Sequence, residues 1–200
     1  MAGINIGLYG FQRSGKSMLA YILAERQRQR GCKVYTNMYT RDFIKIDSLT
    51  DIPFNTEPKV LLLDEAYYFL DSRDFKDNTK STIFWNTIGK LNILLLTTAI
   101  SPDMIEKRIR NQHNYVIISK KEGDIINYLI IDRIRMLKRT FRIKTSEKLF
   151  KKLNYDHQQV PDIIDISLDG FLEKTRDLNK KLYFEGSNYN GKKARQILKG

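Results

Sequence analysis

The sequence contains very few of the residues that build redox and metal sites. Among its 200 residues are one cysteine, Cys32, and two histidines, His113 and His157. A single cysteine excludes an intrachain disulfide and any metal site built from several cysteines. Neither histidine has other ligand residues at the spacing of a metal site, so we interpret both as structural residues.

Long apolar runs are also absent. The longest lie around Val60–Leu63 and Ile93–Leu96, whereas a membrane-spanning helix needs ~20 apolar residues. The chain begins with Met1-Ala2-Gly3 and an alternating segment, which differs from the charged region and apolar core of a secretory signal. We therefore expect a soluble protein with no membrane insertion.

Acidic residues are too few to balance the basic ones. Lysine and arginine number 35 against 23 aspartates and glutamates, which gives a formal net charge of +12. A positive field of this size favours polyanionic partners, chiefly nucleic acid or an anionic membrane face. A solvated basic surface without such a partner is the alternative.

What the chain does contain is an alternation of strand-like and helix-like segments. Hydrophobic residues make up 42% of it, which is enough for a core. Helices are expected after Lys16, near residues 80–89 and from Pro102 onward. Strands are expected at residues 4–9, 33–36, 59–63, 92–98, 114–119 and 124–131. This order predicts an α/β fold with a central, mostly parallel sheet flanked by helices.

The carboxyl-terminal part of the chain is rich in basic residues. Residues 133–152 contain nine lysines and arginines and a single acid, Glu147. Residues 146–183 suggest two helices, and residues 184–200 form a polar tail. We therefore divide the chain into a core at residues 1–145 and a basic, mainly helical extension at residues 146–200 that ends in a flexible tail. Contact with a phosphate backbone would explain the basic density, and so would a protein interface or a solvated face.

One motif is specific for phosphate binding. A pattern of the form G-x-x-x-x-G-K-[ST] is matched in full by Gly10, Phe11, Gln12, Arg13, Ser14, Gly15, Lys16 and Ser17. The backbone N–H groups of such a loop point at one anion, and the following helix adds its positive N-terminus. Lys16 is expected to reach the β- and γ-phosphates, and Ser17 to offer its hydroxyl to Mg²⁺. The motif predicts a P-loop NTPase with ATP and Mg²⁺ as cofactors, although it does not distinguish ATP from GTP.

A pair of acids follows the most apolar of the predicted strands. The run Val60–Leu63 places that strand in the sheet interior, and Asp64 and Glu65 come directly after it. Functional residues of α/β folds lie at the carboxyl ends of the strands. We therefore assign Asp64, together with Ser17, to Mg²⁺, and Glu65 to orienting or deprotonating an attacking water. Two solvated acids at the end of a strand are the alternative.

Two further features suit hydrolysis. The next apolar strand ends in Thr97 and Thr98, a common place for a polar group that senses the γ-phosphate. Arg108 and Arg110 follow it, and an arginine that reaches the γ-phosphate of a neighbouring subunit speeds hydrolysis by roughly 10³–10⁵. Because the two arginines are two residues apart on a predicted helix, they face different directions and only one of them could serve. A solvated or DNA-contacting helix explains these arginines almost as well.

These elements together resemble the FtsK/HerA superfamily. The resemblance rests on the P-loop, on Leu-Leu-Leu-Asp64-Glu65-Ala with Asp71-Ser-Arg73 soon after, on the Thr-Thr strand, and on Lys107-Arg108-Ile-Arg110-Asn-Gln before Tyr115-Val-Ile. Within the superfamily, the sequence is most similar to viral genome-packaging ATPases and to the ATPase domain of zonular occludens toxin-like phage proteins. The resemblance covers about residues 3–120, and only the two nucleotide motifs are specific.

The resemblance implies a ring-forming ATPase that moves double-stranded DNA and has its active sites at subunit interfaces. A capsid or portal-vertex protein would be a further partner, and the protein would act in the cytoplasm of a host cell or with the virion. The family commonly has a Gln directly after the Thr-Thr pair as the γ-phosphate sensor, whereas this chain has Ala99. Thr98 or Thr97 is expected to take that role here.

The sequence therefore favours an ATP-hydrolysing motor that translocates double-stranded DNA and packages a viral genome into a capsid. The alternative is a nucleotide-dependent assembly or morphogenesis factor, as in phage extrusion, that acts through protein–protein contacts. A small-molecule kinase shares the P-loop, but it gains nothing from a water-activating Glu65, so we do not favour it.

Overall fold

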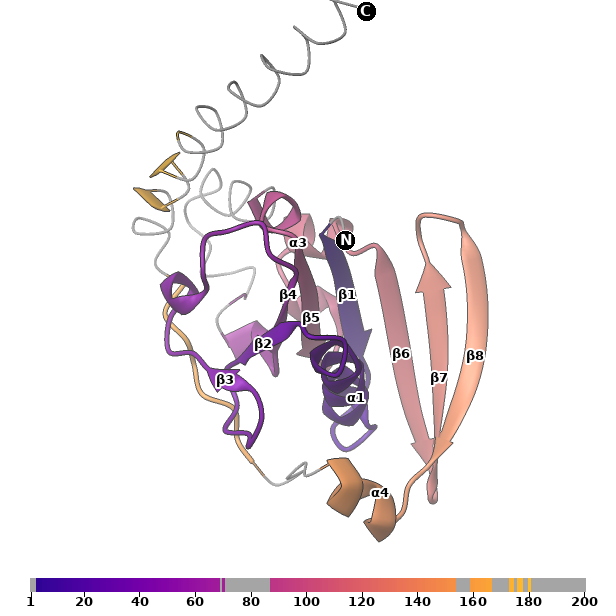
Figure 1. The fold of residues 1–200 in the computed structure, drawn as a ribbon. Coiled ribbons are helices and arrows are strands. Elements are labelled where there is room, and N and C mark those ends of the chain that lie inside the picture. The colour runs from indigo at the N-terminus through magenta and orange to yellow at the C-terminus, as the bar shows by residue number, and fades with distance from the viewer. Residues whose placement is uncertain are drawn as a thin grey trace, which may run out of the picture.

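The computed structural model describes residues 3–68, 70, 87–153, 159–166, 173–174, 176–177 and 180. The described chain forms an eight-stranded sheet in the order β3-β2-β4-β5-β1-β6-β7-β8 (Figure 1). The strands are β1 (Ile4–Tyr9), β2 (Lys33–Thr36), β3 (Ile44–Lys45), β4 (Lys59–Leu63), β5 (Ile93–Ala99), β6 (Tyr115–Glu122), β7 (Ile125–Asp132) and β8 (Leu137–Lys144). The α-helices are α1 (Lys16–Arg28), α3 (Lys107–Asn111) and α4 (Glu147–Leu153), and the 3₁₀ turns are η1 (Leu49–Asp51), η2 (Ala66–Tyr68) and η3 (Pro102–Met104). Residues 87–90 are also helical.

Among the described helices, none combines the length and apolar character needed to cross a membrane.

The strands from β3 to β6 pair in parallel. Within this part, β4 lies between β2 and β5, and β1 lies between β5 and β6. Every residue of β4 and β5 is buried, because these strands lie in the interior of the sheet between two layers. The predicted α/β fold with a mostly parallel sheet is confirmed, and β1, β2, β4 and β5 begin and end within one residue of their predicted bounds.

The strands β6, β7 and β8 form an antiparallel unit at one side of the sheet, which we call the wing (Figure 1). Gly123, with a φ of +63°, makes the tight turn between β6 and β7. The sequence predicted β6 and β7 but not β8, in the stretch from Arg133 where the pattern loosens. In β8 only Phe141 and Ile143 are half-buried, so the strand lacks a clear apolar alternation.

Each face of the parallel strands is covered by its own apolar layer. On one face α1 packs through Leu19, Ala20 and Ala24, which are buried with Leu62 and Leu96. The opposite face is covered by α3 and by the segments around η1 and η2, which contribute to a second buried cluster. Because both layers are filled, the loops at the ends of the parallel strands are held in fixed positions.

The chain continues from the wing into α4, which lies near the end of the sheet where β1 leads into α1 (Figure 1). Residues 159–166 then run beside the β2–β3 end of the sheet. The backbone N–H of Asp162 donates a 3.0 Å hydrogen bond to the carbonyl of Asn37, and that of Asp165 donates a 2.8 Å bond to the carbonyl of Asp47. Residues 159–166 therefore pack on the core, whereas the predicted tail at residues 184–200 lies outside the described residues.

Candidate active site

The predicted phosphate loop connects β1 to α1. It leaves the carboxyl end of β1 at Gly10, and α1 begins at Lys16. Gly15 has a φ of +89°, and a Cβ at this position would lie 2.4 Å from Cδ1 of Ile126 and 2.8 Å from Oη of Tyr128. Gly15 is therefore required both by its left-handed backbone and by the closeness of β7.

Lys16 is held inside this loop. Its side chain is buried, and Nζ donates a 2.9 Å hydrogen bond to the backbone oxygen of Phe11. Burial lowers the pKa of Lys16, and the negative charges of Asp64 and Glu65 oppose that shift. The lysine and both predicted acids therefore share one small volume at the carboxyl ends of β1 and β4.

Asp64 is fixed through both its side chain and its backbone. Its Oδ1 accepts a 2.7 Å hydrogen bond from Oγ1 of Thr98, and the hydroxyl of Ser17 also bonds to this carboxylate. The side-chain amide of Asn37 makes two hydrogen bonds to the backbone of Asp64. Its Nδ2 donates to the carbonyl of Asp64, and its Oδ1 accepts from the backbone N–H of Asp64, both at 2.9 Å. Burial raises the pKa of Asp64, while the bonds from Ser17 and Thr98 act in the opposite direction.

Ser17 and Asp64 form a donor set that suits Mg²⁺. The hydrogen bond between them brings the hydroxyl of the half-buried Ser17 next to the carboxylate of the buried Asp64. Mg²⁺ prefers oxygen ligands and is commonly held by one or two protein groups together with the phosphates of a nucleotide. No group of three or more His, Cys, Asp or Glu side chains within the described residues could hold a metal ion by itself. A cation here would therefore share its coordination with the nucleotide.

Thr98 connects the two acids. Besides its bond to Asp64, its Oγ1 accepts a 2.9 Å hydrogen bond from the backbone N–H of Glu65. Glu65 has a φ of +46°, an uncommon conformation for a residue with a side chain, and it lines the cavity beside the loop. The hydroxyl of Thr98 is thus engaged with the acids, and a direct contact with a γ-phosphate stays a prediction. Ala99 is buried in the apolar cluster on the face opposite α1, so its side chain has no place at the site.

A cavity of about 680 Å³ opens beside these residues, a volume within the usual range for ligand sites. One side of it is formed by the phosphate loop and the two acids. The other side comes from the wing, from α4 and from the segment that follows, through Lys121, Ile126, Thr145, Phe150 and Gln159. The sequence had assigned none of these five residues to the site.

Two hydroxyl groups fasten the wing to the phosphate loop. Oη of Tyr128 donates a 3.0 Å hydrogen bond to the carbonyl of Gly15, and Oγ of Ser119 lies 2.7 Å from Oγ of Ser14. Each bond joins residues more than a hundred positions apart in the chain, and no local pattern connects such residues. The sequence also did not assign Asn37 to the site. This residue directly follows β2, so it stands at a strand end in the same way as Asp64.

The two arginines of α3 lie away from this cavity. The helix packs on the sheet face opposite α1 through the buried Ile109, and neither Arg108 nor Arg110 lines the nucleotide cavity of its own chain. The guanidinium of Arg110 forms an ion pair with Asp103. A catalytic contact by either arginine therefore requires a second chain, and this role stays a prediction. Asp71 and Arg73, which contributed to the sequence resemblance, lie outside the described residues.

The chain is similar to known proteins in its structure and not in its sequence. No model of a known protein family matches the chain, and no curated protein sequence matches it either. Among solved structures, the N-terminal domain of zonular occludens toxin from Neisseria meningitidis is similar, with a TM-score of 0.56 and 14% identity over 76% of this chain and 98% of that one. The genome packaging NTPase B204 from Sulfolobus turreted icosahedral virus 2, in complex with ATP-gammaS, has a TM-score of 0.55 and 13% identity over 70% and 97% of the two chains. The DNA-packaging ATPase B204 from Sulfolobus turreted icosahedral virus has a TM-score of 0.54 and 13% identity over 70% and 98%.

The fold is that of a P-loop NTPase. It is shared with these neighbours at identities of 13–14%, and the motif at residues 10–17 occupies the loop between β1 and α1. The resemblance to viral packaging ATPases and zonular occludens toxin-like proteins, inferred from the sequence, is confirmed at the level of the fold. Membership of the FtsK/HerA superfamily stays a prediction.

Proposed function

We propose that this chain is an ATP-hydrolysing motor that translocates double-stranded DNA and packages a viral genome into a capsid. The observation that carries the proposal is the convergence of Lys16, Asp64 and Glu65 beside a cavity large enough for a nucleotide. A lysine for the phosphates, an acid for a cation and a second acid for water are the groups that phosphoanhydride hydrolysis requires.

Each site residue has a separate part in this proposal. Lys16 binds oxygens of the β- and γ-phosphates, and Ser17 and Asp64 hold Mg²⁺, which neutralises phosphate charge when it is bound. Glu65 accepts a proton from the attacking water as the γ-phosphoryl group is transferred. Thr98 acts as a positioning residue, because its hydroxyl bonds the carboxylate of one acid and the backbone of the other.

The packaging part of the proposal is supported by the structural neighbours and by the charge. One neighbour is a genome packaging NTPase, and another is the DNA-packaging ATPase B204 from Sulfolobus turreted icosahedral virus. The net charge of +12 favours a polyanionic partner. A motor that moves along a genome has to grip the phosphate backbone without regard to sequence, which lysine and arginine side chains accomplish.

In this proposal the active form is a ring of identical subunits. Arg108 or Arg110 faces the γ-phosphate bound by the neighbouring subunit and stabilises the charge of the transition state. The position of α3, away from the nucleotide cavity of its own chain, is compatible with such a contact in trans. A capsid or portal-vertex protein would anchor the ring to the particle.

The proposal is tested by measuring ATP hydrolysis with and without double-stranded DNA over a range of protein concentrations. The wild-type rate per chain is expected to rise on addition of DNA and on assembly. Glu65→Gln is expected to bind ATP with unchanged affinity and to lose turnover, since an amide does not accept the proton from water. Equal hydrolysis by this variant contradicts the role of Glu65. Hydrolysis without any binding of DNA contradicts the motor and indicates the nucleotide-dependent assembly factor.

A further inference from the structure

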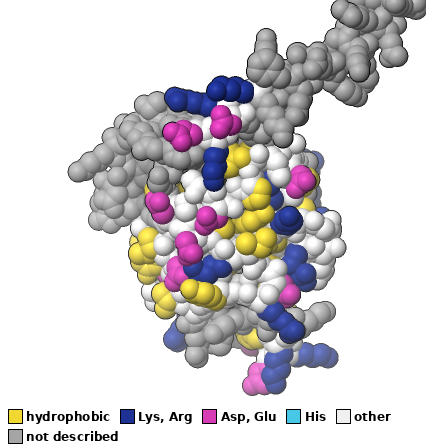
Figure 2. Space-filling model, turned by 60° about the vertical axis from the view of Figure 1, so that its left-hand side comes forward, with side chains coloured by type: hydrophobic (Ala, Val, Ile, Leu, Met, Phe, Trp, Pro, Cys, Tyr) yellow, Lys and Arg dark blue, Asp and Glu magenta, His cyan; other side chains and the backbone are white. Residues whose placement is uncertain are grey.

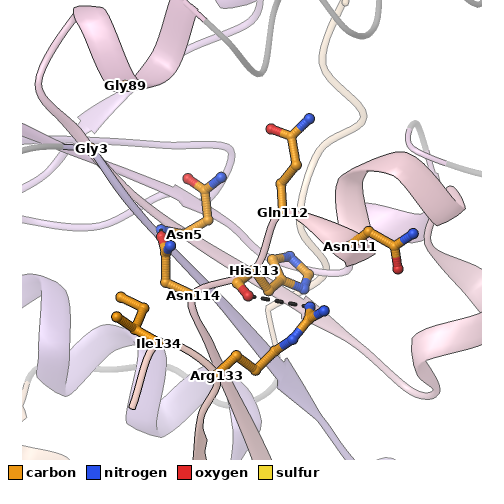
Figure 3. A pocket seen from close by; sticks show the side chains of 9 residues that line it. All are labelled: Gly3, Asn5, Gly89, Asn111, Gln112, His113, Asn114, Arg133 and Ile134. Carbon is orange, nitrogen blue, oxygen red and sulfur yellow. Dashed lines mark hydrogen bonds between the residues drawn. The ribbon is translucent and has the colours of Figure 1, made fainter. Parts of the chain in front are cut away.

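A second cavity lies at the opposite end of the sheet from the phosphate loop. It has a volume of about 510 Å³. Its lining residues come from the start of β1, from the segment between α3 and β6, from the end of the helical residues 87–90, and from the turn after β7 (Figure 3). It shares no lining residue with the nucleotide cavity, so we treat it as a separate site.

Side-chain amides dominate this second cavity. Asn5, Asn111, Gln112 and Asn114 all line it (Figure 3). The backbone N–H of Asn5 donates a 2.8 Å hydrogen bond to Oδ1 of Asn114, which ties β1 to the residue before β6. The side chain of Asn5 is only 8% exposed, and its Oδ1 has no hydrogen-bond partner within the described part of the chain. This oxygen is an acceptor, so the groups of the cavity that can bind an anion are the N–H groups of the amides and not this atom.

Arg133 supplies a fixed positive charge to the same cavity. Its Nη1 donates hydrogen bonds to the backbone carbonyls of Arg110, at 2.9 Å, and of His113, at 3.3 Å. The described residues that line the cavity include no carboxylate. The nearest acid in sequence, Asp132, accepts hydrogen bonds through Oδ1 from the backbone N–H groups of residues 134 and 135. The cavity therefore offers amide N–H groups and a guanidinium without a competing side-chain anion.

Further basic residues stand close in sequence to the lining residues, and we call them the rim of the cavity. Lys90 directly follows the lining residue Gly89, Lys107 begins α3, and Arg135 lies in the turn after β7, and all three are exposed. By contrast, the face of the molecule on the β3 side carries interspersed acidic and basic side chains (Figure 2).

We propose that this amide-lined cavity and its basic rim bind the phosphodiester backbone of double-stranded DNA. Phosphate oxygens accept hydrogen bonds, and the groups that most often contact them in protein–DNA complexes are Arg, Lys, Asn and Gln side chains. Contacts of this kind carry no base information, which is what a translocating motor requires. The inference rests on the DNA partner of the proposed function and places that partner at the end of the sheet farthest from the nucleotide.

Gln112 is the residue best suited to test the proposal. Its side chain makes no hydrogen bond that stabilises the fold within the described residues, so a change there spares the core. Gln112→Glu preserves the shape of the side chain and places a negative charge in the cavity, while Gln112→Ala removes only the amide. Lys148→Ala, in the exposed part of α4 at the other end of the sheet, lowers the net charge by the same amount as Gln112→Glu and serves as the control.

The measurement is the fluorescence anisotropy of a labelled duplex of about 30 base pairs, titrated with each full-length variant at several salt concentrations. Gln112→Glu is expected to weaken binding roughly 10-fold and to reduce the slope of log K against log salt by about 1. Gln112→Ala is expected to weaken it less, and Lys148→Ala to leave it within about 2-fold of the wild type. Binding of an ATP analogue should be the same in all variants.

Three outcomes would overturn the inference. Duplex binding by the wild type that both Gln112 variants leave unchanged shows that DNA binds elsewhere, and the proposed motor then stands without this site. Loss of self-association in Gln112→Glu, with unchanged DNA affinity, assigns the cavity to a contact between copies of the chain. Absence of any duplex binding by the wild type removes the DNA partner itself, and with it both proposals.

Discussion

The hydroxyl of Thr98 donates a 2.7 Å hydrogen bond to Oδ1 of Asp64, and both side chains are buried. The bond holds the carboxylate at the end of β4 by means of the neighbouring strand β5, which pairs with it in parallel. An acid fixed in this way does not need to reorganise when a cation and a nucleotide arrive.

The first prediction concerns this bond. Thr98→Val removes the hydroxyl and keeps the shape, so Asp64 loses a fixed orientation while the core stays filled. Partners that orient metal ligands are commonly worth 10–100-fold in metal affinity or activity, and we expect the Mg²⁺ concentration for half-maximal ATP hydrolysis to rise by about that factor. Thr98→Ser, which retains the hydroxyl, should stay near the wild type. A valine variant with the wild-type Mg²⁺ dependence would show that Thr98 does not position Asp64.

The second prediction concerns the wall of the nucleotide cavity that α4 provides. Phe150 lines the cavity with an aromatic ring, and we expect it to contact the nucleobase. Stacking of a base on an aromatic side chain is worth about 1–3 kcal/mol, so Phe150→Ala should weaken ATP binding by roughly 10-fold or more. Binding of inorganic tripolyphosphate should not change, because that ligand has no base. Equal weakening of both ligands would place Phe150 outside the base contact.

The third prediction concerns the arginines of α3. If one of them acts in trans, a chain that lacks it still has an intact phosphate loop and intact acids. Arg108→Ala or Arg110→Ala should then lose hydrolysis alone, and mixing with Glu65→Gln should restore part of it, because some interfaces combine the intact halves. The rate of the mixture as a function of the mixing ratio is the measurement. An arginine variant that keeps the wild-type rate per chain is not the trans residue.

The fourth prediction concerns His113, which is 2% exposed beneath the second cavity. Burial, with a smaller contribution from the charge of Arg133, lowers its pKa from 6.5 to about 4. Its ring faces the neutral hydroxyls of Tyr9 and Thr97. Between pH 6.5 and pH 4 the unfolded chain therefore binds a proton on this residue while the folded chain does not. Because protonation favours the unfolded chain, the free energy of unfolding decreases as the pH falls from 6.5 toward 4.

Between pH 7 and pH 5 this one histidine is expected to lower the free energy of unfolding by about 2 kcal/mol. Chemical denaturation at a series of pH values measures the effect. His113→Gln retains hydrogen-bonding groups without a titrating ring, so it should show a smaller loss over the same interval. Parallel pH profiles for the two proteins would mean that folding does not lower the pKa of His113.

The parallel half of the fold could be predicted because the apolar or polar character of each short segment matches the burial of that segment. In β4 and β5 every side chain is buried, so the apolar runs are continuous and their ends are clear. The position of Asp64 and Glu65 followed from the same logic, since polar residues after a buried strand stand at its carboxyl end. The phosphate loop is a contiguous motif and needed no tertiary information.

The wing and the far wall of the cavity could not be predicted in the same way. β8 lies at the edge of the sheet and is mostly exposed, so selection for burial leaves little trace in residues 137–144. Phe150 and Gln159 line the nucleotide cavity although they stand far along the chain from the phosphate loop. The bond between Tyr128 and Gly15 depends on the pairing of β1 with β6 and of β6 with β7, which no short segment of sequence specifies.

The packing of His113 restricts which residue can stand at position 7 of β1. Its Nδ1 lies 3.0 Å from the hydroxyl of Tyr9, the residue just before the phosphate loop, and a Cβ on Gly7 would come within 2.6 Å of the same atom. The ring therefore packs directly against the backbone of β1 at Gly7, which leaves no room for a side chain at that position. A side chain at position 7 would have to displace this ring and disturb its contact with Tyr9, so the strand that leads into the phosphate loop accommodates only glycine there.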